Sequence, residues 1–131
     1  MEVHLKNYII KFILVSSLTL VGCDDTEEPY SCTNNVAPAL TIEIIDKETG
    51  DYIACNAIAV IEDNGFSEEV TSLDYGGCDN SLILQGAYER SGVYNVHIYK
   101  EGYLDWSIYN IPVTENRCHV NTVHIIAALE K

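Results

Sequence analysis

Apolar and polar residues alternate in short segments along most of the chain, and turn-forming residues separate these segments. In residues 40–45, for example, Leu40, Ile42 and Ile44 share one parity. Alternation with a period of two is typical of a strand that buries one face. After residue 39, no apolar stripe with a period of 3.6 residues reaches the length of a helix. The pattern therefore predicts an all-β fold.

Seven strands are expected, at residues 40–45, 56–62, 66–73, 82–88, 92–100, 103–113 and 118–130. A hairpin turn at Asn64-Gly65 joins the second strand to the third, because this dipeptide tolerates the positive φ of tight turns. Seven short strands with no helix between them favour two antiparallel sheets packed face to face, which is a β-sandwich.

The start of the chain follows a different pattern. Lys6 and Lys11 precede a mostly apolar run at residues 12–21. A basic start with a short apolar run is typical of a secretory signal peptide and is too short to span a membrane. The run ends in Leu20-Val21-Gly22-Cys23. This ending resembles the bacterial lipobox, in which a small residue precedes the cysteine that receives the lipid.

The lipobox resemblance implies cleavage before Cys23 and attachment of diacylglycerol to its thiol. Two or three acyl chains hold a protein stably on a membrane. We therefore expect residues 1–22 to be a lipoprotein signal peptide, 23–38 a lipidated terminus and tether, and 39–131 the sandwich domain. The protein would face the periplasm or the exterior of the cell envelope. The sequence does not distinguish attachment to the inner membrane from attachment to the outer membrane. The alternative is an ordinary secretory signal with a chance cysteine.

Composition limits the partners of the mature chain. Without residues 1–22, 109 residues remain, and the net charge changes from −13 to −14 because two lysines and one glutamate are lost. This length fits one domain. A strongly acidic protein is a poor candidate for binding nucleic acid, which requires positive charge.

Four further cysteines remain after cleavage, namely Cys32, Cys55, Cys78 and Cys118. An even number in an exported chain predicts two disulfides, and composition alone leaves three pairings open. No Cys-x-x-Cys pair occurs, so a structural zinc site is not expected.

Three segments have a recognisable order of strands and turns. The first is "IDKETGDYIACNAIAVIEDNGF", the second is "GAYERSGVYNVHIYKEGYLDW", and the last is "CHVNTVHIIAAL". Together they resemble a carboxypeptidase regulatory-like domain. The resemblance covers most of residues 39–129 and implies an immunoglobulin-like or transthyretin-like β-sandwich of about seven strands. It implies no catalytic residues, because the module carries none in metallocarboxypeptidases. Asp51-Tyr52 and Ser91 depart from the prolines that are frequent in relatives.

The disulfide pairing follows from this resemblance. In many immunoglobulin-like sandwiches the last strand lies parallel to the first, which would bring Cys118 near Cys32. Cys55 and Cys78 would flank the open end of the Asn64-Gly65 hairpin. We therefore expect the pairs Cys32–Cys118 and Cys55–Cys78.

Titratable residues give little support for a metal or an active site. His119 and His124 are five residues apart on one expected strand, so their side chains should point to opposite faces. They are therefore not expected to form a metal site together with His97. The hairpin and the loop after it are rich in acids, but the spacing of a calcium loop is absent, so a solvated edge is expected. No nucleophile elbow occurs. We expect no metal, no cofactor and no enzymatic activity.

The aromatic residues near the sixth expected strand suggest a ligand surface. Alternation places Leu104, Trp106 and Ile108 in the core and leaves Tyr103 and Tyr109 together on the outer face. Packing alone explains Trp106. The expected function is therefore a non-enzymatic, lipid-anchored envelope module with a structural or protein-binding role. The alternatives are a carbohydrate- or small-ligand-binding module that uses Tyr103 and Tyr109, and, least supported, an enzyme.

Overall fold

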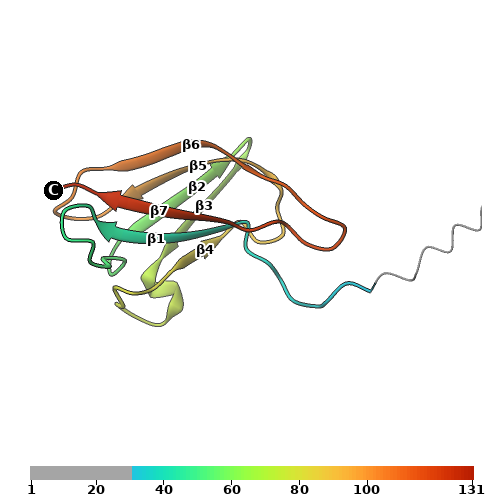
Figure 1. Ribbon diagram of the computed structural model, residues 1–131, viewed down its shortest axis with the longest axis horizontal. Coiled ribbons are helices and arrows are strands. Elements are labelled where there is room, and N and C mark those ends of the chain that lie inside the picture. The colour runs from blue at the N-terminus through green and yellow to red at the C-terminus, as the bar shows by residue number, and fades with distance from the viewer. Residues whose placement is uncertain (1–30) are drawn as a thin grey trace, which may run out of the picture. The chain divides into compact units, whose positions relative to one another are not determined.

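The computed structural model describes residues 31–131, which form a β-sandwich with one short 3-10 turn and no α-helix (Figure 1). The elements are β1 (Leu40–Asp46), β2 (Ile58–Asp63), β3 (Phe66–Thr71), η1 (Ser72–Tyr75), β4 (Leu84–Gly86), β5 (Gly92–Tyr99), β6 (Trp106–Val113) and β7 (Val123–Leu129). The predicted signal peptide, Cys23 and residues 23–30 of the tether lie outside the described residues.

The strands form two sheets, one with the order β4-β1-β7 and one with the order β3-β2-β5-β6. The predicted fold class is confirmed, with one correction to the strand directions. β1 and β7 pair in parallel along their whole length, from Leu40 opposite Val123 to Asp46 opposite Leu129. The expectation of antiparallel sheets, drawn from the strand pattern, is therefore wrong for this pair. The parallel arrangement of the first and last strands that the resemblance implies is confirmed, and the chain reaches β7 from the other sheet.

The core lies between the two sheets and is built by the alternating residues. Ile42 and Ile44 of β1 are fully buried, as are Tyr94, Val96 and Ile98 of β5. Each such aliphatic side chain contributes about 1.5–3 kcal/mol through burial. The hydroxyl of Tyr94 donates to the carbonyl of Arg90 at 2.8 Å, so this buried tyrosine keeps a partner for its one polar group.

The predicted hairpin is present between β2 and β3. Asp63 pairs with Phe66, so Asn64 and Gly65 form the two-residue connection. Gly65 has a φ of 81°, a conformation that costs glycine nothing because it has no Cβ.

β3 is shorter than the alternation suggests because a 3-10 turn interrupts it. The side chain of Thr71 accepts a hydrogen bond from the backbone N–H of Leu73, and the carboxylate of Asp74 accepts one from the N–H of Thr71. This reciprocal cap starts the turn Ser72–Tyr75 and ends the strand.

β6 also differs from its predicted course. Val96 pairs with Ile108 and Tyr94 pairs with Ile111, so β6 has one more residue than β5 over this interval. The extra residue forms a bulge in which Asn110 takes a φ of 58°. Because of the bulge, Ile108 and Ile111 both face the core although their parities differ.

Candidate functional site

Two disulfides fasten the described domain. Cys32 is bonded to Cys118 and Cys55 to Cys78, with Cα–Cα distances of 5.4 Å and 4.6 Å. The pairing expected from the resemblance is therefore confirmed. The Cys32–Cys118 bond joins residues that are 86 positions apart and attaches the tether to the segment just before β7.

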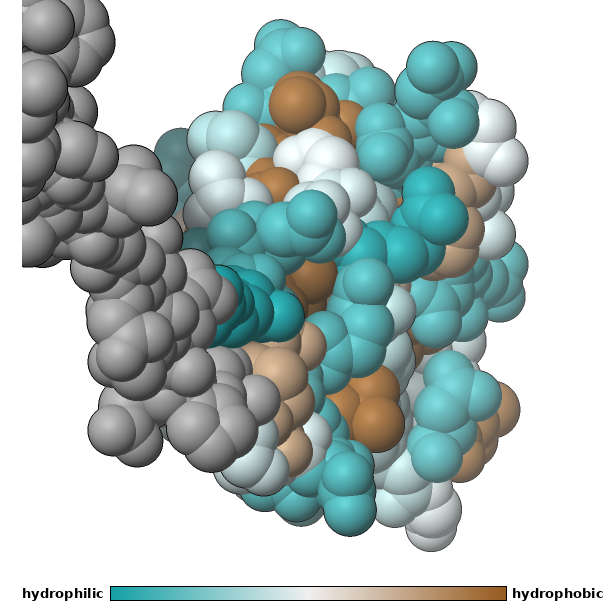
Figure 2. Space-filling model, turned by 90° about the vertical axis from the view of Figure 1, so that its right-hand side faces the viewer, coloured by the Kyte–Doolittle hydropathy of each residue, from teal (hydrophilic) through white to brown (hydrophobic). Residues whose placement is uncertain are grey.

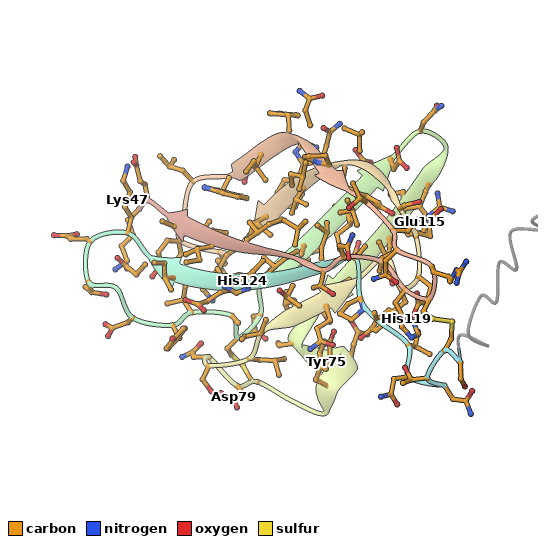
Figure 3. All side chains as sticks on the ribbon, turned by 45° about the vertical axis from the view of Figure 1, so that its right-hand side comes forward. Lys47, Tyr75, Asp79, Glu115, His119 and His124 are labelled. Carbon is orange, nitrogen blue, oxygen red and sulfur yellow. A yellow bond between two sulfur atoms is a disulfide. The ribbon has the colours of Figure 1, made fainter. Side chains whose placement is uncertain are left out.

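A shallow pocket of about 520 Å³ lies beside the Cys32–Cys118 bond. Its walls come from the tether, from the loop after β4 and from the connection between β6 and β7, including Thr33, Val36, Glu89, Glu115 and His119. Figure 3 shows His119 and Glu115 at the end where the tether meets the domain, with Lys47 at the opposite end. Seen from this end, the surface is mostly hydrophilic with separate apolar spots (Figure 2).

His119 links the tether to the domain inside this pocket. Its Nδ1 lies 2.8 Å from Oε1 of Glu89, and its Nε2 lies 3.0 Å from Oγ1 of Thr33. Glu89 also accepts a hydrogen bond of 2.7 Å from the backbone N–H of Ala37. This N–H and the imidazole lower the pKa of the Glu89 carboxyl, so it is ionised at neutral pH. The three contacts hold residues 33–37 against the sandwich.

The prediction that His119 lies on the last strand is wrong. β7 begins at Val123, and His119 lies in the preceding loop, where its N–H donates to Oδ1 of Asn116 at 3.1 Å. The same oxygen accepts from the N–H of Cys118. The side chain of Asn116 therefore stabilises a turn at residues 116–119, although the alternation of the sequence predicts a strand there.

The other two histidines of the described domain lie on the outer faces of different sheets. His97 of β5 lies 3.7 Å from Glu62 and contacts the hydroxyl of Ser107 at 2.8 Å. His124 of β7 lies 3.6 Å from Glu43. Within residues 31–131, no three His, Cys, Asp or Glu side chains are grouped closely enough to hold a metal ion.

Tyr103 and Tyr109 do not share an exposed face, so the predicted tyrosine surface is wrong in part. β6 begins at Trp106, and Tyr103 lies in the preceding turn, where it packs against the edge of the core. Leu104, expected inside, is 60% exposed. Alternation fails here because the chain is not yet in a strand. Tyr109 does face outward and is 59% exposed.

Tyr109 has aromatic neighbours on β5 that the alternation of the sequence does not reveal. Its ring meets the imidazole of His97 edge to face, with 5.5 Å between the ring centroids. Tyr99 lies two residues from His97 on the same face of β5 and is 42% exposed. The outer face of β5 and β6 therefore carries three aromatic rings. The sequence does not reveal this grouping, because the register of β5 against β6 depends on the bulge.

The opposite end of the domain is closed around Asp46, the last residue of β1. Its Oδ1 accepts from the backbone N–H groups of Glu48 and Thr49, and its Oδ2 accepts from the Tyr103 hydroxyl and from Nζ of Lys131. Hydrogen bonds from Lys131 and Tyr103 hold the pKa of Asp46 far below its ordinary value. The same contacts raise the pKa of Lys131 and of Tyr103.

The acids near the hairpin have local structural partners. Glu68 accepts a hydrogen bond of 2.6 Å from the backbone N–H of Ala87, and Asp79 accepts bonds from the N–H and hydroxyl of Ser81. Asp63 lies 4.0 Å from the guanidinium of Arg90. These contacts connect loops to strands and give the acids a role besides solvation.

The chain was also compared with known proteins. No family model matches it, and no curated protein matches it. Within the described part, no helix has both the length and the hydropathy to cross a membrane.

Proposed function

We propose that the protein is a non-enzymatic, lipid-anchored module of the bacterial cell envelope that holds a binding β-sandwich on a short tether. The observation that carries this proposal is the pairing of the four cysteines after Cys23. Two disulfides use all four, so Cys23 is the one cysteine without a role inside the described domain. Disulfides also fit an oxidising compartment outside the cytoplasm.

The location of the fastened tether supports the same proposal. The chain enters the domain at Cys32, nine residues after Cys23 in the sequence. An extended segment of this length reaches roughly 30 Å, which keeps the sandwich close to the membrane. The partner would then meet the end around Asp46 or the outer faces of the sheets, away from the pocket beside the tether.

Membership of the carboxypeptidase regulatory-like group is part of this proposal. The sandwich of seven strands is consistent with it, as is Asp46 at the end of β1, whose side chain accepts from the turn formed by Glu48 and Thr49. In that group the module accompanies other functions, so a structural or protein-binding role is expected.

Metabolic labelling with a fatty-acid analogue tests the anchor. The wild-type chain should be labelled and should sediment with membranes, whereas Cys23→Ala should be unlabelled. Ser17→Ala, a change in the same segment, is the matched control and should behave like wild type. Equal labelling and membrane attachment of Cys23→Ala would show that the lipoprotein proposal is wrong.

A second candidate function is binding of a carbohydrate on the outer face of β5 and β6. The observation that favours it is the pair of exposed tyrosines on this face, Tyr99 and Tyr109, the second of which packs against His97, since aromatic rings can stack on the apolar faces of sugars. A glycan array should give signals that Tyr109→Ala removes and that Tyr52→Ala, an exposed tyrosine elsewhere, retains. Signals no higher than background for the wild-type protein would rule out this candidate.

A further inference from the structure

The four edge strands of the sandwich differ in how well they are protected against pairing with another strand. β4 has three residues, and the hydroxyl of Tyr75 covers its edge by accepting from the N–H of Gln85 and donating to its carbonyl. Both bonds are shorter than 3 Å. Short edges with a covering side chain do not serve as templates for a further strand.

The two edges of the four-stranded sheet are protected in other ways. β3 carries the adjacent acids Glu68 and Glu69, whose charges oppose pairing with a like strand. β6 contains Pro112, which has no N–H to donate, and the bulge at Asn110. Charge, proline and a bulge are the usual means by which proteins protect sheet edges.

β7 has none of these protections. It has seven residues, with the sequence VHIIAAL, and contains no acid, lysine, arginine or proline. One side of the strand bonds to β1, as the bonds from Val123 N to Ala39 O and from Lys47 N to Leu129 O show. The carbonyl of Glu130 points to the other side, where it accepts from the N–H of Leu104.

Because backbone groups alternate along a strand, the even-numbered residues of β7 share the side of Glu130. These residues are His124, Ile126 and Ala128. Among residues 31–131, no backbone hydrogen bond outside the sheets reaches them. Their N–H and C=O groups therefore form a free edge. It is bounded on one side by Asn121, which is bonded to Thr114, and on the other by Glu130, which is bonded to Leu104.

We propose that this edge pairs with the same edge of a second copy of the chain, antiparallel and centred on Ile126. In this register Ile126 faces Ile126 of the other copy and His124 faces Ala128. The even-numbered residues then lie opposite even-numbered residues and have outward backbone groups, as the hydrogen-bonded pairs of an antiparallel ladder require, and they alternate with non-bonded pairs of odd-numbered residues. The two three-stranded sheets would then form one continuous six-stranded sheet about a two-fold axis.

The side chains are compatible with this register. Ile126 is 54% exposed on the outer face, so the central pair would remove two apolar side chains from water. No like charges face each other, because the free stretch at residues 124–128 has no acid, lysine or arginine and ends before Glu130, whose carbonyl is bonded to Leu104. A strand with this composition therefore fits its own copy better than a charged partner.

The net charge of the domain opposes this association and gives it a recognisable salt dependence. Residues 31–131 contain fifteen Asp and Glu and five Lys and Arg. Two domains of such charge repel each other, and salt screens the repulsion. The dimer should therefore become stronger as ionic strength rises. The inference does not depend on lipidation, so Cys23→Ala should dimerise as well.

Cysteine cross-linking of the full-length chain in its host membrane tests the register. Ile126→Cys places two thiols opposite each other at a Cα distance of about 5.5 Å, which suits a disulfide. We expect a covalent dimer on a non-reducing gel. Ile83→Cys is the matched control, since Ile83 is also exposed but precedes β4, and it should remain monomeric. A monomer for Ile126→Cys, or a covalent bond to a different protein, would overturn the proposal.

Sedimentation of the full-length protein gives an independent measurement that uses no added thiol. Ile126→Lys adds to β7 the type of charge that protects natural edges, and it should abolish the dimer while the monomer keeps the wild-type circular dichroism spectrum. Ile83→Lys should keep the dimer. A wild-type protein that is monomeric at both low and high salt, or an unchanged dimer in Ile126→Lys, would show that β7 does not pair with itself.

Discussion

The hydroxyl of Tyr103 donates a hydrogen bond of 2.9 Å to Oδ2 of Asp46, a residue 57 positions earlier in the chain. Asp46 ends β1 in one sheet, and Tyr103 lies in the turn that leads into β6 in the other. The bond therefore joins the two sheets at one end of the sandwich. Asp46 is only 4% exposed, and four hydrogen-bonding groups surround its carboxylate.

The first prediction concerns Asp46 and acid. Its folded pKa lies below the unfolded value, so its charge stabilises the fold above the unfolded pKa, and this contribution is lost as the pH falls toward the folded pKa. Asp46→Asn should lower the melting temperature at neutral pH, and its difference from wild type should shrink below about pH 4. Thermal unfolding monitored by circular dichroism at several pH values checks this. Asp51→Asn, an exposed acid of the same loop, should match wild type throughout.

The second prediction concerns Gly86 in β4. A Cβ at this position would lie 2.5 Å from Cδ1 of Ile61 and 3.0 Å from Oε2 of Glu68. Gly86→Ala should therefore destabilise the fold by roughly 1–3 kcal/mol, the usual cost of overpacking. Urea unfolding gives the value. The double variant Gly86→Ala with Ile61→Val, which lacks the clashing Cδ1, should be more stable than the sum of the single changes predicts, and strict additivity would contradict the steric explanation.

The third prediction concerns the tyrosine that covers the edge of β4. Tyr75→Phe removes the partner of both backbone groups of Gln85. The loss should be about 1 kcal/mol, because water reaches this half-exposed site and replaces part of the bonding. Hydrogen exchange at Gln85 should accelerate. Tyr88→Phe loses only a bond to the side chain of Gln85 and should leave that amide unchanged.

The fourth prediction concerns the disulfide that fastens the tether. Replacing Cys32 and Cys118 by serine should expose residues 32–36 to proteases while the sandwich stays folded. Ala37 remains bonded to Glu89, and the carbonyl of Pro38 still accepts from Thr122. Limited proteolysis with mass spectrometry locates the cleavage. Global unfolding of this variant would mean that the disulfide is needed for the fold itself and not just for the tether.

Much of the fold could be predicted because burial in a sandwich follows local alternation. Ile42, Ile44, Val96 and Ile98 face the core as their parity indicates. The errors occur where hydrogen bonds of individual side chains or a bulge change the course of the chain. Asn116 delays the start of β7, and Asn110 shifts the parity of β6. Neither effect has a period that a sequence pattern could reveal.

The candidate surfaces were harder to predict than the core. His119 and Glu89 meet although they are 30 positions apart, and Tyr109 meets His97 only because of the pairing of β5 with β6. The disulfides could be paired because the resemblance implies parallel first and last strands, which bring Cys32 near Cys118, and because Cys55 and Cys78 flank the open end of the hairpin. A contact between loops depends on backbone turns that no strand register determines. The sequence therefore did not predict that Thr33 and Glu89 contact His119.

The bond between Cys32 and Cys118 also determines how the domain carries mechanical load. Tension on the chain before Cys32 enters the sandwich along two covalent routes, through the backbone into β1 and through the sulfur atoms into the segment before β7. Since β1 and β7 are parallel neighbours, both are pulled from the same end. The two strands are then pulled as one unit and do not slide past each other, so the load falls on the pairing of β1 with β4 and on the packing of both strands against the facing sheet.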